Sequence, residues 1–532
     1  MRDLHLPGRS PALGRTAMAA TSHVTATIAA IDILRSGGNA VDAAVAAAAV
    51  QAVVEPQMTS PGGDVFALVA LPDGPIHGLN ASGRCPAALD ADAMRSMGWS
   101  SIPIDHGLAV SVPGAVEGWA ELLSRFGRLG LDTVLSAAID TAENGYPVSQ
   151  RVAYDWGHNV ERLQASPGAR KHLLRGDGET PSTGDMFYSK ALAATLRRIA
   201  EDGPEGFYKG AVAEDMCAAV QAAGGVMTPD DLAAVSVDLT DPVIAPYRDV
   251  EVVELPPNTQ GMIAHLILRI LEGFDHNGLD PLSAERFHLQ IEATRLAYAV
   301  RDQYLADPEH MAAGPDAFLT DAFVSGLRNR IDPNWRIGDV GPITAPGSDT
   351  IVLSVVDGDG IAVTLINSIF KDFGGTIVGD QSGVVLQNRG AAFNLIEGHA
   401  NCAAPGKRPL HTLIPGMIRT DGRISHAFGV MGGQYQACGH AHVVSNMVDF
   451  GMDPQEALDC PRVFMDGFSP DSPLTLERGI SGRTLEGLID RGHRVEIRRT
   501  PWGGGQVIAI DPTSRVRIGG SDPRKDGAAL GY

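Results

Sequence analysis

The segment from Gly341 to Asp357 places the strongest constraint on how this 532-residue chain can fold. It begins with a Gly/Pro-rich stretch, GPITAPGSD, that is incompatible with regular secondary structure. It ends in a β-branched apolar run, which predicts a buried strand. Thr350 stands at the junction, so a break in the backbone there would make Thr350 a new N-terminus.

Length and charge narrow the classes of protein to consider. A chain this long predicts one large elaborated fold or two closely packed halves. The formal net charge of −21 disfavours nucleic acid and anionic membranes as partners. No apolar run approaches the roughly 18 residues of a membrane span, and the N-terminus has no apolar signal-like core. Five cysteines without a CxxC pair indicate neither a disulfide framework nor a zinc knuckle, so we expect a reduced, cytoplasmic protein.

Sequence periodicity changes at Thr350. Before it, helical patterns dominate, and Asn39 is predicted to cap an alanine-rich helix. After it, two apolar runs joined by Asp-Gly-Asp-Gly predict a hairpin, which favours a largely antiparallel sheet covered by helices. Strands are predicted at 351–356, 361–369, 383–386 and 506–510.

The motifs of common enzyme classes are absent from the sequence. There is no GxSxG, HExxH, Walker or GxGxxG pattern, and no metal or cofactor is expected. A threonine hydroxyl is a poor nucleophile without a base, but an N-terminal threonine carries its own base, the α-amine, with a pKa of about 7.7 to 8.0. Without further context, Thr350 would be interpreted only as the start of a strand.

A series of ordered motifs supplies that context: GGNAVDAA at 37–44, SVPG at 111–114, GFYKG at 206–210, DT at 349–350, SVVD at 354–357, KRPL at 407–410, MGG at 431–433 and SDPR at 521–524. Through these motifs nearly the whole sequence resembles the γ-glutamyltranspeptidase family of N-terminal-nucleophile hydrolases. The resemblance implies an α+β fold, a four-layer αββα sandwich with mainly antiparallel sheets.

The resemblance also implies a proenzyme that cuts itself between Asp349 and Thr350. The Thr350 hydroxyl would attack the Asp349 carbonyl, and water would release the resulting ester. The products would be a large subunit, 1–349, and a small catalytic subunit, 350–532, which together form one fold and are expected to associate as a dimer of heterodimers. The freed threonine would then attack a substrate amide and form an acyl-enzyme, which water or an amine resolves.

Three further residues match catalytic positions of the family. Gly432 and Gly433 match the oxyanion-hole glycines, whose N–H groups can approach a tetrahedral intermediate because no Cβ obstructs them. The alternative for this Gly-Gly pair is a simple turn. Ser368 stands where the family has a threonine whose hydroxyl bonds the amine of the nucleophile.

The residues that recognise glutamate in the family are replaced here. An ungapped register from Thr350 places Phe370, Arg389 and Ala392 where the family has Asn, Gln and Asp. The missing Asp pairs with the substrate α-ammonium, which would be repelled by Arg389. A γ-glutamyl substrate is therefore not expected.

The carboxylate side of the expected site is also altered. His411 and Thr412 replace two adjacent serines, and the family's carboxylate-binding arginine falls at Ser82, with Arg84 two residues later. Arg389 and Arg84 are predicted to bind an anionic substrate, because a guanidinium binds carboxylate in a bidentate manner. The alternative for Arg84 is a surface or structural ion pair.

These substitutions resemble the acylase and oxamate-amidohydrolase-like branch of the family. They predict an autoprocessing amidohydrolase for an amide of a small carboxylate-bearing acyl group, oxamate-like or glutaryl-like, with substrate contacts from Phe370, Arg389, His411 and Thr412. Two alternatives stay open. One is a γ-glutamyltransferase or glutathione hydrolase, and the other is an uncleaved binding module without enzymatic activity.

Overall fold

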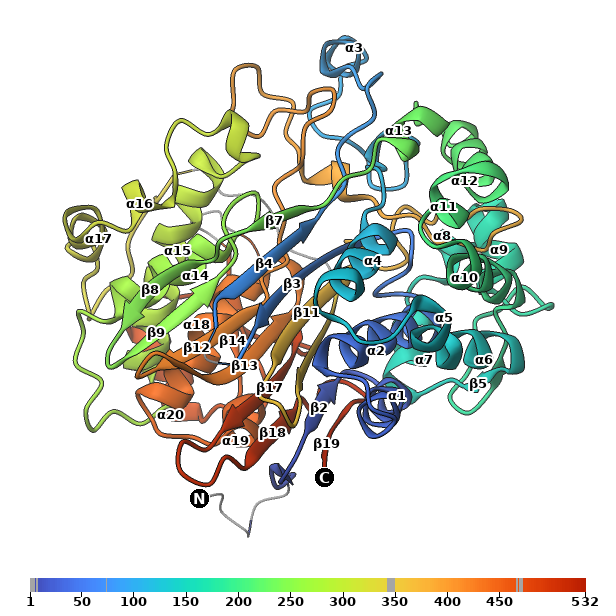
Figure 1. The fold of residues 1–532 in the computed structure, drawn as a ribbon. Coiled ribbons are helices and arrows are strands. Elements are labelled where there is room, and N and C mark those ends of the chain that lie inside the picture. The colour runs from blue at the N-terminus through green and yellow to red at the C-terminus, as the bar shows by residue number, and fades with distance from the viewer. Residues whose placement is uncertain (1–4, 6–7, 73, 342–349, 466, 468–471) are drawn as a thin grey trace.

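Two seven-stranded β-sheets pack face to face at the centre of the molecule, and helices cover both outer surfaces (Figure 1). This computed structural model describes residues 5, 8–72, 74–341, 350–465, 467 and 472–532. All strand pairs within the two large sheets are antiparallel. The expected α+β fold with αββα layers is confirmed.

The first sheet has the order β19-β2-β10-β11-β3-β4-β7 and so interleaves strands from before and after Thr350. β10 and β11 form the predicted hairpin. The strands are β2 (Met18–Thr21), β3 (Asp64–Ala70), β4 (Ile76–Ala81), β7 (Asp238–Thr240), β10 (Ile351–Val356), β11 (Ala362–Ser368) and β19 (Ala528–Gly531).

The second sheet has the order β1-β18-β17-β13-β12-β9-β8 and likewise combines early and late segments. Its strands are β1 (Ala12–Gly14), β8 (Val243–Tyr247), β9 (Val250–Glu254), β12 (Gly416–Thr420), β13 (Arg423–Met431), β17 (Gly504–Ile510) and β18 (Arg517–Ser521). Two smaller sheets contain β5 (Tyr146–Pro147), β6 (Met186–Phe187), β14 (Val463–Met465), β15 (Leu474–Leu476) and β16 (Val495–Ile497).

Side-chain alternation along the strands builds the layers. Successive side chains of a strand point to opposite faces of its sheet. Val352 and Val356 of β10 belong to the apolar cluster between the sheets, whereas Leu353 and Val355 belong to the cluster beneath the helices. Both faces of β10 are buried, and its sequence IVLSVV is apolar except for Ser354, so the predicted buried strand is confirmed.

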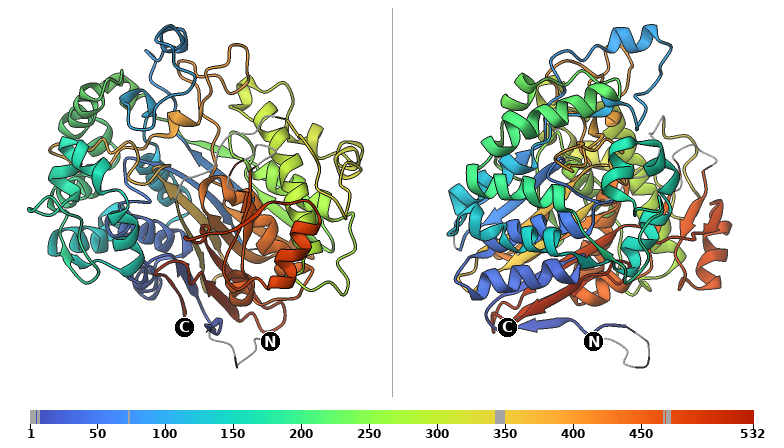
Figure 2. Two further views of the ribbon diagram at one scale, coloured as in Figure 1. Left: turned by 180° about the vertical axis from the view of Figure 1, so that it is seen from behind. Right: turned by 90° about the vertical axis from the view of Figure 1, so that its right-hand side faces the viewer.

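Two groups of helices cover the sheets, and Figures 1 and 2 show them on opposite sides. α1 (Val24–Arg35) and α2 (Ala40–Val54) lie on the first sheet, and the predicted cap is confirmed, since the Asn39 side chain accepts from the Val41 and Asp42 N–H groups. α14 (Gly261–Leu271), α15 (Ala284–Tyr304) and α18 (Gln436–Val448) cover the second sheet. The other α-helices are α3 (Ala91–Ser96), α4 (Ala115–Phe126), α5 (Leu131–Val134), α6 (Ser136–Asn144), α7 (Gln150–Gly157), α8 (Val160–Ala165), α9 (Pro167–Leu173), α10 (Lys190–Asp202), α11 (Glu205–Tyr208), α12 (Gly210–Ala222), α13 (Pro229–Ala233), α16 (Pro315–Phe318), α17 (Asp321–Arg328), α19 (Pro454–Asp459) and α20 (Gly482–Asp490).

The prediction of a strand at 383–386 is wrong. Val384, Val385 and Leu386 are buried in the cluster beneath the helices, but the segment makes only an isolated bridge between Val385 and Val378. Its apolar character therefore reflects burial of a loop rather than membership of a sheet. Among the described residues, none of the helices combines the length and apolar character needed to cross a bilayer.

Candidate active site

Thr350 begins a row of three polar residues at one end of the first sheet. It is fully buried and directly precedes β10. The strand registers place Thr350 beside Ser368, the last residue of β11, and Ser368 beside Asp64, the first residue of β3. The two hydroxyl oxygens of Thr350 and Ser368 lie 3.1 Å apart. Ser368 therefore contacts the predicted nucleophile directly, which is the placement that an orienting role needs.

Asp64 links this row to residues from three other segments of the chain. Its Oδ1 accepts hydrogen bonds from the Gly83 N–H and from Gln387 Nε2, both at 2.9 Å. Its Oδ2 accepts from His411 Nε2 at 3.0 Å. Asp64 is absent from the sequence-based expectations, although a signal existed: a carboxylate at the start of a wholly apolar, buried strand needs polar partners.

His411 acts in this site as a neutral hydrogen-bond donor. Burial, reinforced by the positive charge of Arg389, lowers the pKa of His411 to about 3. Because a carboxylate can only accept, the imidazole donates to Asp64 from Nε2, while Nδ1 accepts from the Leu413 N–H. His411 therefore does not titrate between pH 5 and 9, and its tautomer is fixed by both neighbours.

Arg389 is a fully buried cation with unused donors. Its Nη1 donates to Thr412 Oγ1 at 3.0 Å, but Nε and Nη2 have no hydrogen-bond partner among the residues that the structure describes. Burial lowers the pKa of Arg389 to about 9, and the charge of Asp64 opposes this effect, so the guanidinium is charged at neutral pH. A buried charge with two unpartnered nitrogens is costly unless a ligand accepts hydrogen bonds from them.

Phe370 packs against this guanidinium. The Arg389 Cζ lies 4.1 Å from the centroid of the Phe370 ring, a cation–π distance. Phe370 has a φ of +79°, which is unusual for a residue other than glycine and costs on the order of 1–3 kcal/mol. The Phe370 N–H donates to Ser368 Oγ at 3.0 Å and helps to hold this conformation. The strained backbone thus connects the Thr350–Ser368 pair to the buried cation.

Gly432 and Gly433 lie where β13 ends and a helix begins. Their φ values of +121° and +54° are in the left-handed region, which favours glycine. They open a 3-10 turn that continues into α18, and the first N–H groups of a helix are free to bind an anion. Gln260 Nε2 donates to the carbonyl oxygens of both Thr412 and Gly433, at 3.0 and 3.1 Å. Gln260 thus connects the Gly433 turn to Thr412. The role of the two glycines as an oxyanion hole stays a prediction.

The structure brings most of the predicted site residues into one connected group. Hydrogen bonds, strand pairing and ring contacts connect these residues, and Asp64 and Gln260 are the bridging side chains. The members of this group are Thr350, Ser368, Phe370, Arg389, His411, Thr412, Gly432 and Gly433.

Two predicted residues are not part of the group. The Arg84 guanidinium donates to the Gly406 carbonyl at 3.0 Å and lies 3.6 Å from Asp307 and 3.7 Å from Glu309. These contacts match the ion-pair alternative, and a substrate role for Arg84 stays a prediction. Asp349 lies outside the described residues.

A prediction follows for Asp64. We expect Asp64→Asn to lower the free energy of unfolding by about 1.5–3 kcal/mol, and the thermal unfolding midpoint with it. Three charge-assisted hydrogen bonds weaken, and the charge that compensates Arg389 is lost. The double variant Asp64→Asn/Arg389→Met should lose less than the sum of the single variants, measured by differential scanning calorimetry. Additive losses would show that the two residues are not coupled.

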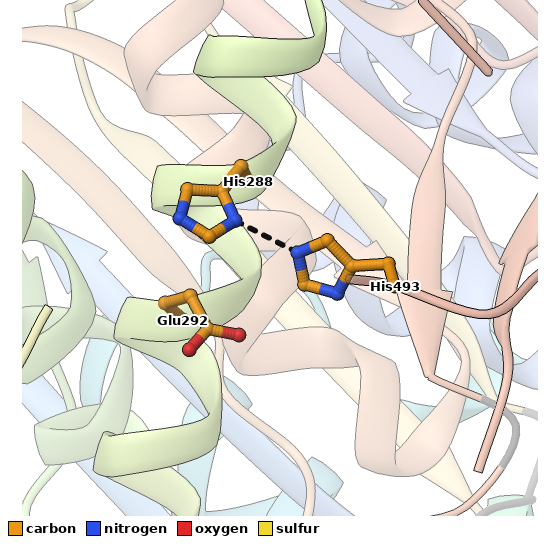
Figure 3. A group of neighbouring side chains, drawn as sticks. All are labelled: His288, Glu292 and His493. Carbon is orange, nitrogen blue, oxygen red and sulfur yellow. Dashed lines mark hydrogen bonds between the residues drawn. The ribbon is translucent and has the colours of Figure 1, made fainter. Parts of the chain in front are cut away.

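One cluster elsewhere has metal-ligating residue types: His288 and Glu292 on α15, and His493 (Figure 3). The His288 Nδ1 and His493 Nε2 atoms are 2.7 Å apart, a hydrogen-bond distance, whereas two nitrogens on a tetrahedral zinc are separated by about 3.3 Å. Glu292 already accepts from Arg295 Nη1 at 3.0 Å and from the Ile337 N–H at 2.6 Å. The cluster connects α15 to the segment after α20. Both ring nitrogens of His288 and both carboxylate oxygens of Glu292 are already hydrogen-bonded within the protein.

Known proteins resemble this chain over nearly its full length. The family profile described as Gamma-glutamyltranspeptidase matches residues 26–532. The glutathione hydrolase-like YwrD proenzyme of Bacillus subtilis is 36% identical over 98% of this chain and 99% of its own length. The oxamate amidohydrolase proenzyme of Klebsiella pneumoniae is 36% identical over 97% of this chain and 98% of its own.

The fold is shared with solved structures as well. A cephalosporin acylase from Bacillus halodurans superposes with a TM-score of 0.93 at 35% sequence identity, covering 100% of this chain and 98% of the acylase. Together with the family match, this covers both sheets and every residue of the connected group. The chain therefore belongs to the γ-glutamyltranspeptidase family of N-terminal-nucleophile hydrolases and is an amide hydrolase or transferase of that family.

Proposed function

We propose that the chain is a proenzyme that cuts itself between Asp349 and Thr350 and then uses Thr350 to hydrolyse the amide of a small, carboxylate-bearing acyl group. The mature protein consists of residues 1–349 and 350–532. Relatives named as proenzymes support the cleavage. The contact between the Thr350 and Ser368 hydroxyls supports Thr350 as the nucleophile.

The proposed substrate class rests on one observation, the environment of the Arg389 guanidinium. This group is buried against the Phe370 ring and charged, and two of its nitrogens have no hydrogen-bond partner among the described residues. A substrate carboxylate would accept from these donors and neutralise the charge in one step. The relative named oxamate amidohydrolase acts on an amide of this kind, because oxamate carries a carboxylate next to its amide carbonyl.

Each group of the site has one role in the proposed reaction. Thr350 Oγ1 attacks the amide carbonyl while its proton passes to the α-amine of the same residue. The N–H groups of Gly432 and Gly433 stabilise the oxyanion. Collapse breaks the C–N bond, the amine leaves with the proton, and the acyl group remains as an ester on Thr350. Water then cleaves the ester by the reverse proton path, releasing the acid and restoring the hydroxyl.

The γ-glutamyl alternative requires a partner for the substrate α-ammonium. Asp64 is the carboxylate nearest to Arg389 in the connected group, and it already accepts three hydrogen bonds. An ammonium at this position would have only the remaining lone pair of Oδ2 to bond and would stand beside a cation. This arrangement favours an acyl group that has a carboxylate and lacks the ammonium.

A panel of amides tests the proposal. Purified, processed protein is given oxamate, a glutaryl anilide, a γ-glutamyl anilide and glutathione under one condition, and kcat/KM is measured for each. We expect kcat/KM for the preferred amide, whose acyl group has a carboxylate and no ammonium, to exceed that for both γ-glutamyl compounds by at least about tenfold. A like-charge contact at about 4 Å in a partly buried site costs about 1.4 kcal/mol or more. Faster turnover of the γ-glutamyl compounds would establish the alternative instead. The cytoplasmic location and the dimer of heterodimers stay predictions.

A further inference from the structure

A buried glutamine, Gln260, connects two parts of the candidate site that the proposed reaction uses separately. It directly precedes α14 and is fully buried. Its Nε2 donates to the carbonyl oxygen of Thr412 at 3.0 Å and to that of Gly433 at 3.1 Å. Thr412 in turn contacts the buried cation, because its Oγ1 accepts from Arg389 Nη1 at 3.0 Å. One side-chain amide therefore lies between the predicted oxyanion turn and the residue that directs Arg389.

The orientation of this amide is determined by its partners. Both carbonyl oxygens can only accept hydrogen bonds, so they must face the Nε2 end of the side chain. At the other end, Arg301 Nη1 can only donate, and it lies 3.3 Å from Gln260 Oε1. A flipped amide would lose all three hydrogen bonds. A side chain that cannot donate twice at this position would break the connection between Thr412 and Gly433.

The surroundings of Gln260 hold it in place. Its backbone N–H donates to the His411 carbonyl oxygen at 3.0 Å, and the His411 N–H donates to the Asn258 carbonyl oxygen at 2.8 Å. Arg301, in the last turn of α15, also binds the side-chain oxygen of Gln434, which follows the two glycines. The amide and the turn are thus attached to the same helix. Gln260 therefore acts as a spacer of constant length.

A fixed spacer has a direct consequence for the acyl group of the substrate. In the proposed reaction the amide oxygen is bound by the N–H groups of Gly432 and Gly433, and the terminal carboxylate is bound by Arg389. The length of the acyl chain sets the separation of these two substrate groups. Because the two binding groups of the protein are held at a constant separation, a chain one methylene too short or too long is misplaced at one of them.

We propose that Gln260 is a positioning residue through which the enzyme selects its substrate by the length of the acyl chain. The inference rests on the proposed function, because it needs a carboxylate at Arg389 and an amide at Thr350. Gln260 acts through Thr412 and Gly433 and does not itself bind the substrate. Its loss should therefore weaken the discrimination between chain lengths, whereas a general loss of stability would lower the rates for all lengths alike.

Five anilides test this inference. Oxalyl, malonyl, succinyl, glutaryl and adipyl 4-nitroanilide share one leaving group and differ only in the length of a carboxylate-bearing acyl chain. kcat and KM are measured, per cleaved chain, for the wild type, Gln260→Glu and Gln260→Met. Glutamate keeps the shape and the acceptor for Arg301 but has no N–H donor, and methionine keeps neither polar group.

We expect the wild type to prefer one chain length over its neighbours by at least about tenfold in kcat/KM, because a misplacement of about 1 Å can lower a rate by about 100-fold. In both variants this preference should fall to about threefold or less, mainly through a lower kcat for the preferred length. Differences in intrinsic reactivity between the anilides cancel when each variant is compared with the wild type.

Gln290→Met is the matched control. Gln290 is a buried glutamine on α15, but its amide bonds Cys438 and His442 and no member of the connected group. Its removal should leave the length preference unchanged. If neither Gln260 variant cleaves itself, the wild-type profile alone decides.

Two outcomes would overturn the inference and leave the proposed function standing. One is a wild-type profile without a preferred length, and the other is an equal loss of activity toward all lengths in the Gln260 variants. Hydrolysis of none of the five anilides by the wild type would contradict the proposed function, and the inference with it.

Discussion

Thr350→Ala is expected to leave the chain as a single 55.9 kDa polypeptide and to abolish amide hydrolysis. In the proposed reaction this hydroxyl attacks both the Asp349 carbonyl and the substrate, and the variant lacks it. Its methyl group fits the space of the threonine, so the surrounding strands should be preserved. A denaturing gel and intact-mass measurement give the state of the chain, and N-terminal sequencing of the smaller wild-type fragment should begin at Thr350.

Thr350→Ser is the matched variant, because it keeps the hydroxyl and loses only the methyl group. It should cleave and should retain measurable activity. A wild-type chain that stays intact after prolonged incubation would instead support the uncleaved binding module. Cleavage of Thr350→Ala at the same bond would show that another group performs the attack.

Arg389→Gln should lower kcat/KM for the carboxylate-bearing substrate by about 100-fold or more. Removing one partner of a buried, charge-assisted pair costs about 2–5 kcal/mol, and each 1.4 kcal/mol is a factor of ten. Arg389→Lys should recover only part of the loss, since an ammonium lacks the planar fork that binds a carboxylate through two bonds. Steady-state kinetics with a carboxylate-bearing amide and its neutral analogue measures the effect, which should be much smaller for the neutral compound.

The stability of this variant provides an independent check. Arg389 has two buried nitrogens without partners among the described residues, so Arg389→Gln should unfold at the same temperature as the wild type or higher. Arg125→Gln is the control, because Arg125 is half-exposed and pairs with Glu121 on the surface of α4. Equal losses of activity toward the charged and the neutral substrate would remove Arg389 from carboxylate recognition.

Local sequence patterns predicted the elements whose partners are close in the chain. The Asn39 cap depends on backbone groups two and three residues away, and the β10–β11 hairpin depends on a four-residue turn between two apolar runs. The segment 383–386 shows the limit of this reasoning. A short buried apolar run has the same composition in a strand and in a loop, and only the positions of its hydrogen-bond partners distinguish the two.

The sequence by itself determined where the chain changes character, at Thr350, and which family pattern it follows. The tertiary structure decided the electrostatics around that point. Asp64 and His411 are 347 positions apart and meet only because folding brings the start of β3 against the segment that precedes β12. Arg389 and Arg84 have the same side chain, yet folding buries Arg389 against Phe370 and leaves Arg84 in ion pairs nearer the surface. Burial and neighbouring charge, which set what each guanidinium can bind, are properties of the packed chain and not of its residue types.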